Sequence, residues 1–184
     1  MTDSTTLAEL MARGAASAPA IRTPGREALT YENLRALSAT TRGVLNAAGI
    51  GRNDRIAIVL PNGPEMATAF LSLAACATAA PLNPAYKADE FEFYLSDLSA
   101  KAVIVLDGDE SPVIAAAAKL DIPLIPLTPQ SDGPAGAFSL APIAAAPAAN
   151  GGMAGPHDTA LILHTSGTTS RPKIVPLSHS NVCA

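Results

Sequence analysis

The chain has 184 residues, of which 48% are hydrophobic and 15% are charged, and its formal net charge is −4 at pH 7. This balance is typical of a globular protein and excludes an intrinsically disordered one. The acidic charge, without a dense cluster of Lys and Arg, gives no expectation of nucleic-acid binding.

Helical and extended patterns alternate along residues 1–127, which predicts an α/β fold. A first helix is expected over residues 4–16, with Leu7, Leu10 and Met11 on its buried face. Pro24-Gly25 predicts a tight turn between two short strands. The further expected strands are 55–60, 79–82, 102–106 and 123–127, and the expected helices are 30–48, 64–77, 89–98 and 112–120. Right-handed crossovers between successive strands then predict mostly parallel pairing with flanking helices.

The best-defined helix ends are those of the helix over residues 30–48. Thr30 is a candidate N-cap, and Glu32 follows in the first turn, where a negative charge favours the helix dipole. Gly49 stands where a left-handed C-terminal residue is expected, and Ile50 can close the helix end by an apolar contact.

The composition changes after residue 127. Residues 128–157 are rich in Ser, Gly, Pro and Ala without a period, which predicts a long connector. Residues 158–184 are expected to hold a strand over 159–164, a polar loop and a strand over 174–177. A helix opens at Ser178, but we expect no room for it to form. The chain is therefore divided into an α/β unit (1–127), a connector (128–157) and a strand–loop–strand segment (158–184).

The polar loop carries the strongest chemical signal. It reads Thr165-Ser166-Gly167-Thr168-Thr169-Ser170-Arg171-Pro172-Lys173. Hydroxyl groups, the close backbone approach allowed by Gly167, and the Lys173 ammonium together suit a polyphosphate. Pro172 and Ile174 exclude a Walker A loop, and the residues around Ser166 do not form the G-x-S-x-G elbow of serine hydrolases. A solvated hairpin turn is the alternative interpretation, which we consider weaker.

The loop resembles the T-S-G-T-T-G-x-P-K signature of the adenylate-forming superfamily, which includes acyl-CoA synthetases, luciferases and the adenylation domains of peptide synthetases. The resemblance covers nearly the whole chain, because further matching segments occur in the order and spacing of that family. They are residues 30–34, 49–57, 60–65, 80–84 and 178–182. Residues 90–97, His164, and Ser170 followed by Arg-Pro-Lys are most similar to the oxalate–CoA ligases within the family.

The resemblance implies that the chain is the N-terminal subdomain of the large domain of an AMP-forming carboxylate–CoA ligase. The fold is then incomplete, and the adenine, ribose and second-step residues belong to a C-terminal portion that follows residue 184. ATP, Mg²⁺, coenzyme A and a small carboxylic acid are the implied ligands. The implied phosphate-binding residues are Thr165, Ser166, Gly167, Thr168, Thr169 and Lys173. Lys173 is also the candidate catalytic residue, and Thr168 the candidate contact to Mg²⁺.

Other acids remain possible substrates, because the family's acid-binding pocket lies mostly beyond residue 184. A fatty-acid or aryl–CoA ligase is the alternative of the same class, and a truncated, inactive remnant is the alternative of another class. We expect the 184-residue chain alone to be inactive. The polar N-terminus and the lack of a long apolar run give neither a secretory signal nor a membrane span. A cytoplasmic location is expected, and any peroxisomal signal would lie at a C-terminus outside this chain.

Single residues leave further questions. Family members usually have Gly at the position of Ile174, so Ile174 either strains the loop or continues the outgoing strand. His164 could touch a ligand or complete a turn, and it has no second metal ligand in sequence reach. Cys76 is expected in the core and His157 on the surface. Cys76 and Cys183 are expected to be reduced.

Overall fold

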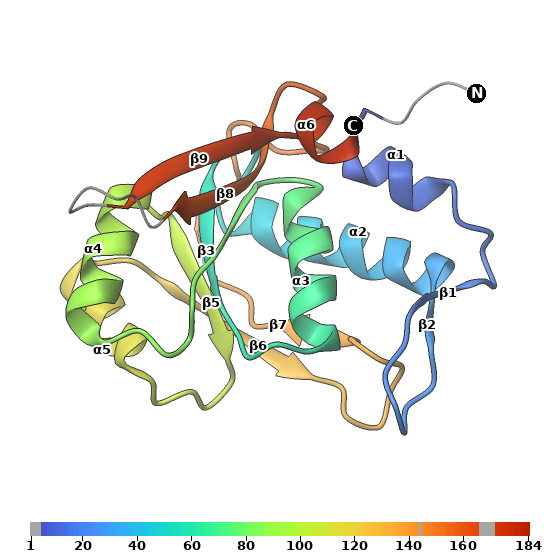
Figure 1. Cartoon of the computed structure of the whole chain (residues 1–184), viewed down its shortest axis with the longest axis horizontal. Helices are drawn as coiled ribbons and strands as arrows, with labels where there is room; N and C mark the ends of the chain where they lie inside the picture. The colour runs from blue at the N-terminus through green and yellow to red at the C-terminus, as the bar shows by residue number, and fades with distance from the viewer. Residues whose placement is uncertain (1–4, 144, 166–171) are drawn as a thin grey trace.

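The computed structural model of the chain describes residues 5–143, 145–165 and 172–184. Its centre is a seven-stranded sheet in the order β7-β6-β5-β3-β4-β8-β9 (Figure 1). The five inner strands pair in parallel, and an antiparallel strand closes each edge. The predicted α/β fold with a mostly parallel sheet is therefore confirmed. The strands are β3 (Arg55–Val59), β4 (Thr78–Pro81), β5 (Ala102–Leu106), β6 (Leu124–Pro129), β7 (Phe138–Leu140), β8 (Thr159–Thr165) and β9 (Lys173–Ser178).

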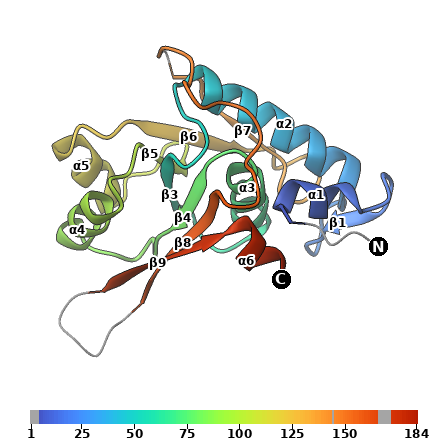
Figure 2. The ribbon, with the colours of Figure 1, turned by 90° about the horizontal axis from the view of Figure 1, so that it is seen from above.

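Two helical layers enclose the sheet. The helices α2 (Tyr31–Ala47) and α3 (Pro64–Ala74) lie on one side, and α4 (Ala88–Leu98) and α5 (Pro112–Lys119) on the other (Figure 2). Side chains alternate along a strand, so β3 serves both cores. Ile56 and Ile58 pack with residues of α2 and α3, whereas Ala57 and Val59 join the cluster around Phe91 of α4. Within the described ranges, every helix is too short or too polar to cross a membrane.

The N-terminal segment differs in part from its prediction. Helix α1 (Leu7–Ala12) is shorter than the expected range, because Thr6 caps it by accepting a hydrogen bond from the Glu9 amide. Leu7 and Met11 are buried as expected, but Leu10 is 46% exposed, so its expected place on the buried face was wrong. The predicted turn joins β1 (Pro19–Ile21) to β2 (Leu29–Thr30) in an antiparallel pair.

Helix α2 begins and ends where the sequence predicts. The Thr30 hydroxyl accepts a hydrogen bond from the Asn33 amide at 3.2 Å. Gly49 adopts a φ of +77°, and the Ile50 amide donates to the Leu45 carbonyl at 2.9 Å. Ile50 is 2% exposed and forms part of the core cluster that α2 and α3 share. This closure turns the chain from α2 toward β3.

The range expected to be a connector contains a strand that the sequence did not predict. Residues Phe138–Leu140 form β7, which pairs antiparallel with β6. Phe138 is 4% exposed, and the Gly136 carbonyl just before the strand accepts a 2.7 Å hydrogen bond from the Thr68 hydroxyl. A three-residue strand is too short to show a period, which is why composition alone indicated a loop. The division of the chain at residues 127 and 157 stays a prediction.

Gly49 at the C-terminal end of α2 and Gly43 inside α2 make a matched pair for measuring backbone strain. At Gly49, an added Cβ would lie 2.9 Å from the Ala146 carbonyl oxygen. The substituted residue would also have to keep the left-handed backbone conformation of Gly49, whose φ is +77°. Gly43, inside α2, has nothing within 4 Å of an added Cβ. We expect Gly49→Ala to lower the free energy of unfolding by about 1–2 kcal/mol. Gly43→Ala should raise it by about 0.5–1 kcal/mol. Urea unfolding followed by circular dichroism measures both, and equal effects would contradict this account of the C-cap.

Candidate functional site

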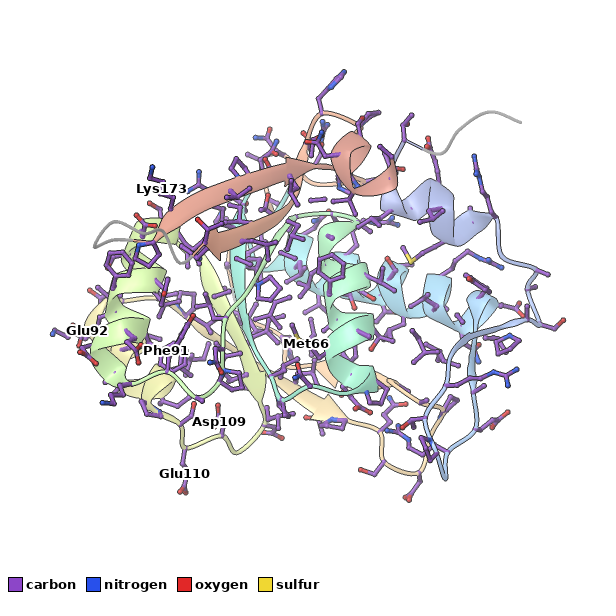
Figure 3. The ribbon with its side chains drawn as sticks, in the orientation of Figure 1. Met66, Phe91, Glu92, Asp109, Glu110 and Lys173 are labelled. Carbon is purple, nitrogen blue, oxygen red and sulfur yellow. The ribbon has the colours of Figure 1, made fainter. Side chains whose placement is uncertain are left out.

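The predicted phosphate loop connects β8 to β9. The last residue of β8, Thr165, pairs directly with the first residue of β9, Lys173, and the Thr165 hydroxyl makes a long, 3.5 Å contact with the Lys173 carbonyl. Figure 3 shows Lys173 at the end of β9 that lies far from α6. The predicted residues Ser166, Gly167, Thr168 and Thr169 lie outside the described residues. The structure thus brings together the two residues that flank the loop, Thr165 with its hydroxyl group and Lys173 with its ammonium group.

Lys173 has the surroundings expected of a ligand-binding cation. It is exposed, and within the described part of the chain no carboxylate pairs with its ammonium group. Its charge therefore remains available to an anion. Over the same residues, no three His, Cys, Asp or Glu side chains gather into a possible metal site.

The structure answers the question about Ile174. It lies in β9 opposite His164, and its side chain packs against the cluster around Phe91. The described residues other than glycine with positive φ are Asn53, Ser99 and Asp121, so Ile174 carries no strain of that kind. Of the two interpretations left open, the structure supports a continuing strand residue.

His164 is held by helix α4. Its Nε2 lies 3.3 Å from Oδ2 of Asp97, and its ring stands edge-on to Tyr94 at 4.7 Å between centroids. Tyr94 in turn stacks on Tyr86 at 4.7 Å, and the His164 side chain is 6% exposed. Two separate features that resemble oxalate–CoA ligases, residues 90–97 and His164, therefore contact each other. Through this contact α4 fixes the end of β8 from which the loop departs.

A buried carboxylate, which sequence reasoning missed, fixes the other end of β8. Asp158 is 8% exposed and accepts hydrogen bonds from Arg52 Nε at 2.7 Å, Asn53 Nδ2 at 2.8 Å and the Gly155 amide at 2.6 Å. The Asn53 side chain also accepts from the Thr159 amide at 2.9 Å. The hydrogen bond from Arg52 is the largest cause that lowers the pKa of Asp158 to about 2. More than 100 residues separate Asp158 from Arg52 and from Asn53. No local sequence pattern could therefore reveal that these side chains pair.

The segment after β9 forms a helix, contrary to expectation. Helix α6 (His179–Cys183) is capped by the Ser178 hydroxyl, which accepts from the Asn181 amide. His179 is fully buried, and its Nδ1 accepts a 3.1 Å hydrogen bond from the Leu7 amide of α1. Burial is the main cause that lowers the pKa of His179. The neutral ring thus joins the two terminal helices, since an N–H donor requires an unprotonated Nδ1.

The remaining predicted residues have structural places. Cys76 is buried, which raises the pKa of its thiol to about 12, and His157 is exposed. Glu92 of α4 forms an ion pair with Lys119 at 2.6 Å. An apolar groove of about 370 Å³ lies between α2 and β7. Because β7 and β9 are opposite edges of the sheet, this groove is remote from Lys173.

Comparison with known proteins defines the class. The AMP-binding enzyme family matches residues 9–184, and the chain belongs to this family. The oxalate–CoA ligase of Arabidopsis thaliana is 40% identical over 99% of the chain. The long-chain-fatty-acid–CoA ligase FadD13 of Mycobacterium tuberculosis is 34% identical over 84% of the chain. The chain spans 37% and 30% of these relatives' own lengths.

A solved structure agrees with this membership. MatB of Rhodopseudomonas palustris superposes with a TM-score of 0.72 in its apo form and 0.71 in its ATP-bound form. The sequence identities are 26% and 27%, over 95% of this chain and 35% of MatB. The likeness shows that the β-sheet and its helices are those of an N-terminal region in an adenylate-forming enzyme.

Substitution of Asp158 tests whether its hydrogen bonds with Arg52 and Asn53 stabilise the start of β8. Its pKa is lowered from 3.8 to about 2 in the fold, so the carboxylate stabilises the folded state above about pH 4. That contribution is lost as the pH falls through about 2. We expect Asp158→Asn to lower the free energy of unfolding at pH 7 by about 1–2 kcal/mol, since Arg52 is partly solvated.

The difference between wild type and Asp158→Asn should narrow as the pH falls below 4. Urea unfolding at several pH values measures it. Asp132→Asn, at an exposed position, is the matched control and should change the free energy of unfolding little. A constant difference from pH 7 to pH 2 would show that the carboxylate charge does not stabilise this junction.

Proposed function

We propose that this chain is the N-terminal, phosphate-binding part of an ATP-dependent, AMP-forming carboxylate–CoA ligase. The observation that carries the proposal is the placement of Lys173 opposite Thr165 at the loop end of the β8–β9 hairpin, exposed and without a described carboxylate partner. Membership of the AMP-binding enzyme family and the likeness to ATP-bound MatB support the same role. The residues proposed to hold the phosphates are Thr165, Ser166, Gly167, Thr168, Thr169 and Lys173.

The proposed chemistry has two steps. A carboxylate oxygen attacks the α-phosphorus of ATP, the bond to the β-phosphate oxygen breaks, and pyrophosphate leaves with the electron pair. The CoA thiolate then attacks the acyl carbon, and AMP leaves. The loop hydroxyls and amides donate to the β- and γ-phosphates, and Lys173 stabilises the charge that develops on pyrophosphate. Thr168 would offer its hydroxyl to Mg²⁺, whose charge offsets that of the phosphates.

Oxalate is the acid that we propose. The 40% identity with the Arabidopsis oxalate–CoA ligase supports it, as does the contact of His164 with Asp97 and Tyr94, since both segments resemble that subgroup. A fatty-acid–CoA ligase is the second candidate, favoured by the 34% identity with FadD13. We place the enzyme in the cytoplasm as part of the same proposal, with a peroxisomal signal possible in a C-terminal portion.

A chimera tests the phosphate loop. This chain would replace the matching region of the Arabidopsis oxalate–CoA ligase, and pyrophosphate release would be measured with oxalate, ATP and CoA. We expect Lys173→Ala to slow the reaction by about 10²–10³, the effect typical of one lost preorganised donor. Its melting temperature should stay unchanged, because an exposed side chain leaves no cavity.

Lys87→Ala is the matched control for Lys173→Ala, because Lys87 is also exposed and its ammonium group has no described partner. This control should release pyrophosphate at the rate of the parent chimera. Pyrophosphate release by the Lys173→Ala chimera at the rate of the parent chimera would contradict the assignment of this loop as the phosphate-binding loop. An active parent chimera that prefers a fatty acid to oxalate would change only the proposed acid.

The chain alone should not turn over. The residues implied to bind adenine and ribose belong to a C-terminal portion, so we expect no pyrophosphate release above background from the 184-residue protein with oxalate, ATP and CoA. Adding the chimera to the same assay confirms that the reagents are competent. Turnover by the chain alone would show that residues 1–184 suffice for adenylation. No turnover by either protein would favour the inactive remnant.

A further inference from the structure

His179 joins α6 to α1 through a contact that requires a neutral ring. Its side chain is fully buried, and its Nδ1 accepts a 3.1 Å hydrogen bond from the Leu7 amide, where the two helices lie side by side (Figure 1). Leu7 is the first residue of α1, so its amide is one of the donors that the helix itself leaves unpaired. We call this hydrogen bond and the ring that accepts it the His179 contact.

A second proton has no favourable place on this ring. A proton on Nδ1 would bring two N–H groups face to face, because the Leu7 amide can only donate. That amide also lies in the first turn of α1, where the helix dipole disfavours a positive charge. Nε2 of His179 is buried as well, and no described residue accepts a hydrogen bond from it. Protonation therefore has to break the His179 contact and bring the ring toward water.

The groups around the ring do not remove this cost. Burial lowers the pKa of His179, and the Ala74 carbonyl and the Asp158 carboxylate oppose that effect less strongly. The pKa of Asp158 is lowered to about 2 and that of Glu9 is also lowered, so both stay charged where a histidine titrates. Burial raises the pKa of the Cys183 thiol, which stays neutral there. The charged or titratable groups on the elements packed against the ring are Glu9 and Arg13 on α1, Cys183 on α6, His157 and Asp158 before β8, Glu65 at the far end of α3 and Lys173 at the far end of β9.

The two helices depend on the ring to different degrees. The backbone amide of His179 donates to the Asp158 carbonyl at 3.0 Å, and this bond does not involve the ring. The C-terminal end of α1 is held by Arg35, whose Nη1 donates to the Met11 carbonyl at 3.2 Å. The first turn of α1, in contrast, is hydrogen-bonded to α6 by the His179 contact. Loss of the contact therefore opens the first turn of α1 and leaves α6 and the β8–β9 hairpin in place.

We propose that the His179 contact is a pH-sensitive link, which holds the first turn of α1 on α6 at neutral pH and releases it when the ring gains a proton. The direction follows from linkage between folding and proton binding. The pKa of His179 is lowered in the fold, whereas a released ring regains its ordinary value of 6.5. The link is therefore fully formed above that value and loses stability as the pH falls below it. The loss levels off once the pH is below the lowered pKa of the folded state.

Amide hydrogen exchange of the 184-residue protein, followed residue by residue by NMR, tests the proposal. From pH 7.5 to pH 5.5 we expect the protection factors of the Leu7 and Leu10 amides to fall about tenfold, because a released ring of pKa 6.5 is about ten times more often protonated than neutral at pH 5.5. His179→Asn places an amide oxygen where Nδ1 lies, so it can accept from Leu7 without titrating, and it should abolish the change. His157→Asn, at an exposed histidine, is the matched control and should behave as wild type does.

The alternatives give different results. Equal protection of the Leu7 amide at both pH values would overturn the proposal, as would a loss at pH 5.5 that persists in His179→Asn. A loss that extends to the Ile50 amide, which closes α2, would show acid unfolding of the whole fold and would overturn it too. If His179→Asn does not fold, the ring signals of the wild-type protein decide. The loss of Leu7 protection then has to follow the titration of the His179 ring, and a loss that follows His157 or His164 instead would contradict the proposal.

Discussion

The position of the candidate site depends on one buried carboxylate. Asp158 receives hydrogen bonds from Arg52 and Asn53, which belong to the turn before the central strand β3, and its own carbonyl accepts the His179 amide. A buried anion is stable only with such donors around it. These hydrogen bonds fix where β8 enters the sheet, after the segment that follows β7. The hairpin, its loop and α6 all follow from that point.

The second constraint comes from α4. β8 meets β4 at the pair Ala79 and Leu161, and its far end is held by the contact of His164 with Asp97 and Tyr94. The strand is thus held at its start by the hydrogen bonds of Asp158, and near its end by the contacts of His164 with Asp97 and Tyr94. A strand fixed at both ends presents its terminal residues in a defined place, which preorganisation of a phosphate site requires.

The same fixation explains the unequal faces of the hairpin. The side held by α4 takes Ile162 and Ile174 into a core cluster, whereas the other side remains partly exposed at Leu161, Leu163, Val175 and Leu177. His179 links α6 to α1 beside this region through the Leu7 amide. The terminal helices therefore contact each other at one end of the hairpin, and Lys173 lies exposed at its other end.

The sequence by itself determined the alternation of helices and strands, the caps at Thr30 and Gly49, and the position of the hydroxyl-rich loop. These are local properties, set by side-chain period, backbone preference and short-range hydrogen bonds. Only the tertiary structure decided that Asp158 meets Arg52, that His164 meets Asp97, and that Phe138 lies in an edge strand. Such contacts join residues far apart in the chain, and pairing energy between strands depends on neighbours that no local pattern names.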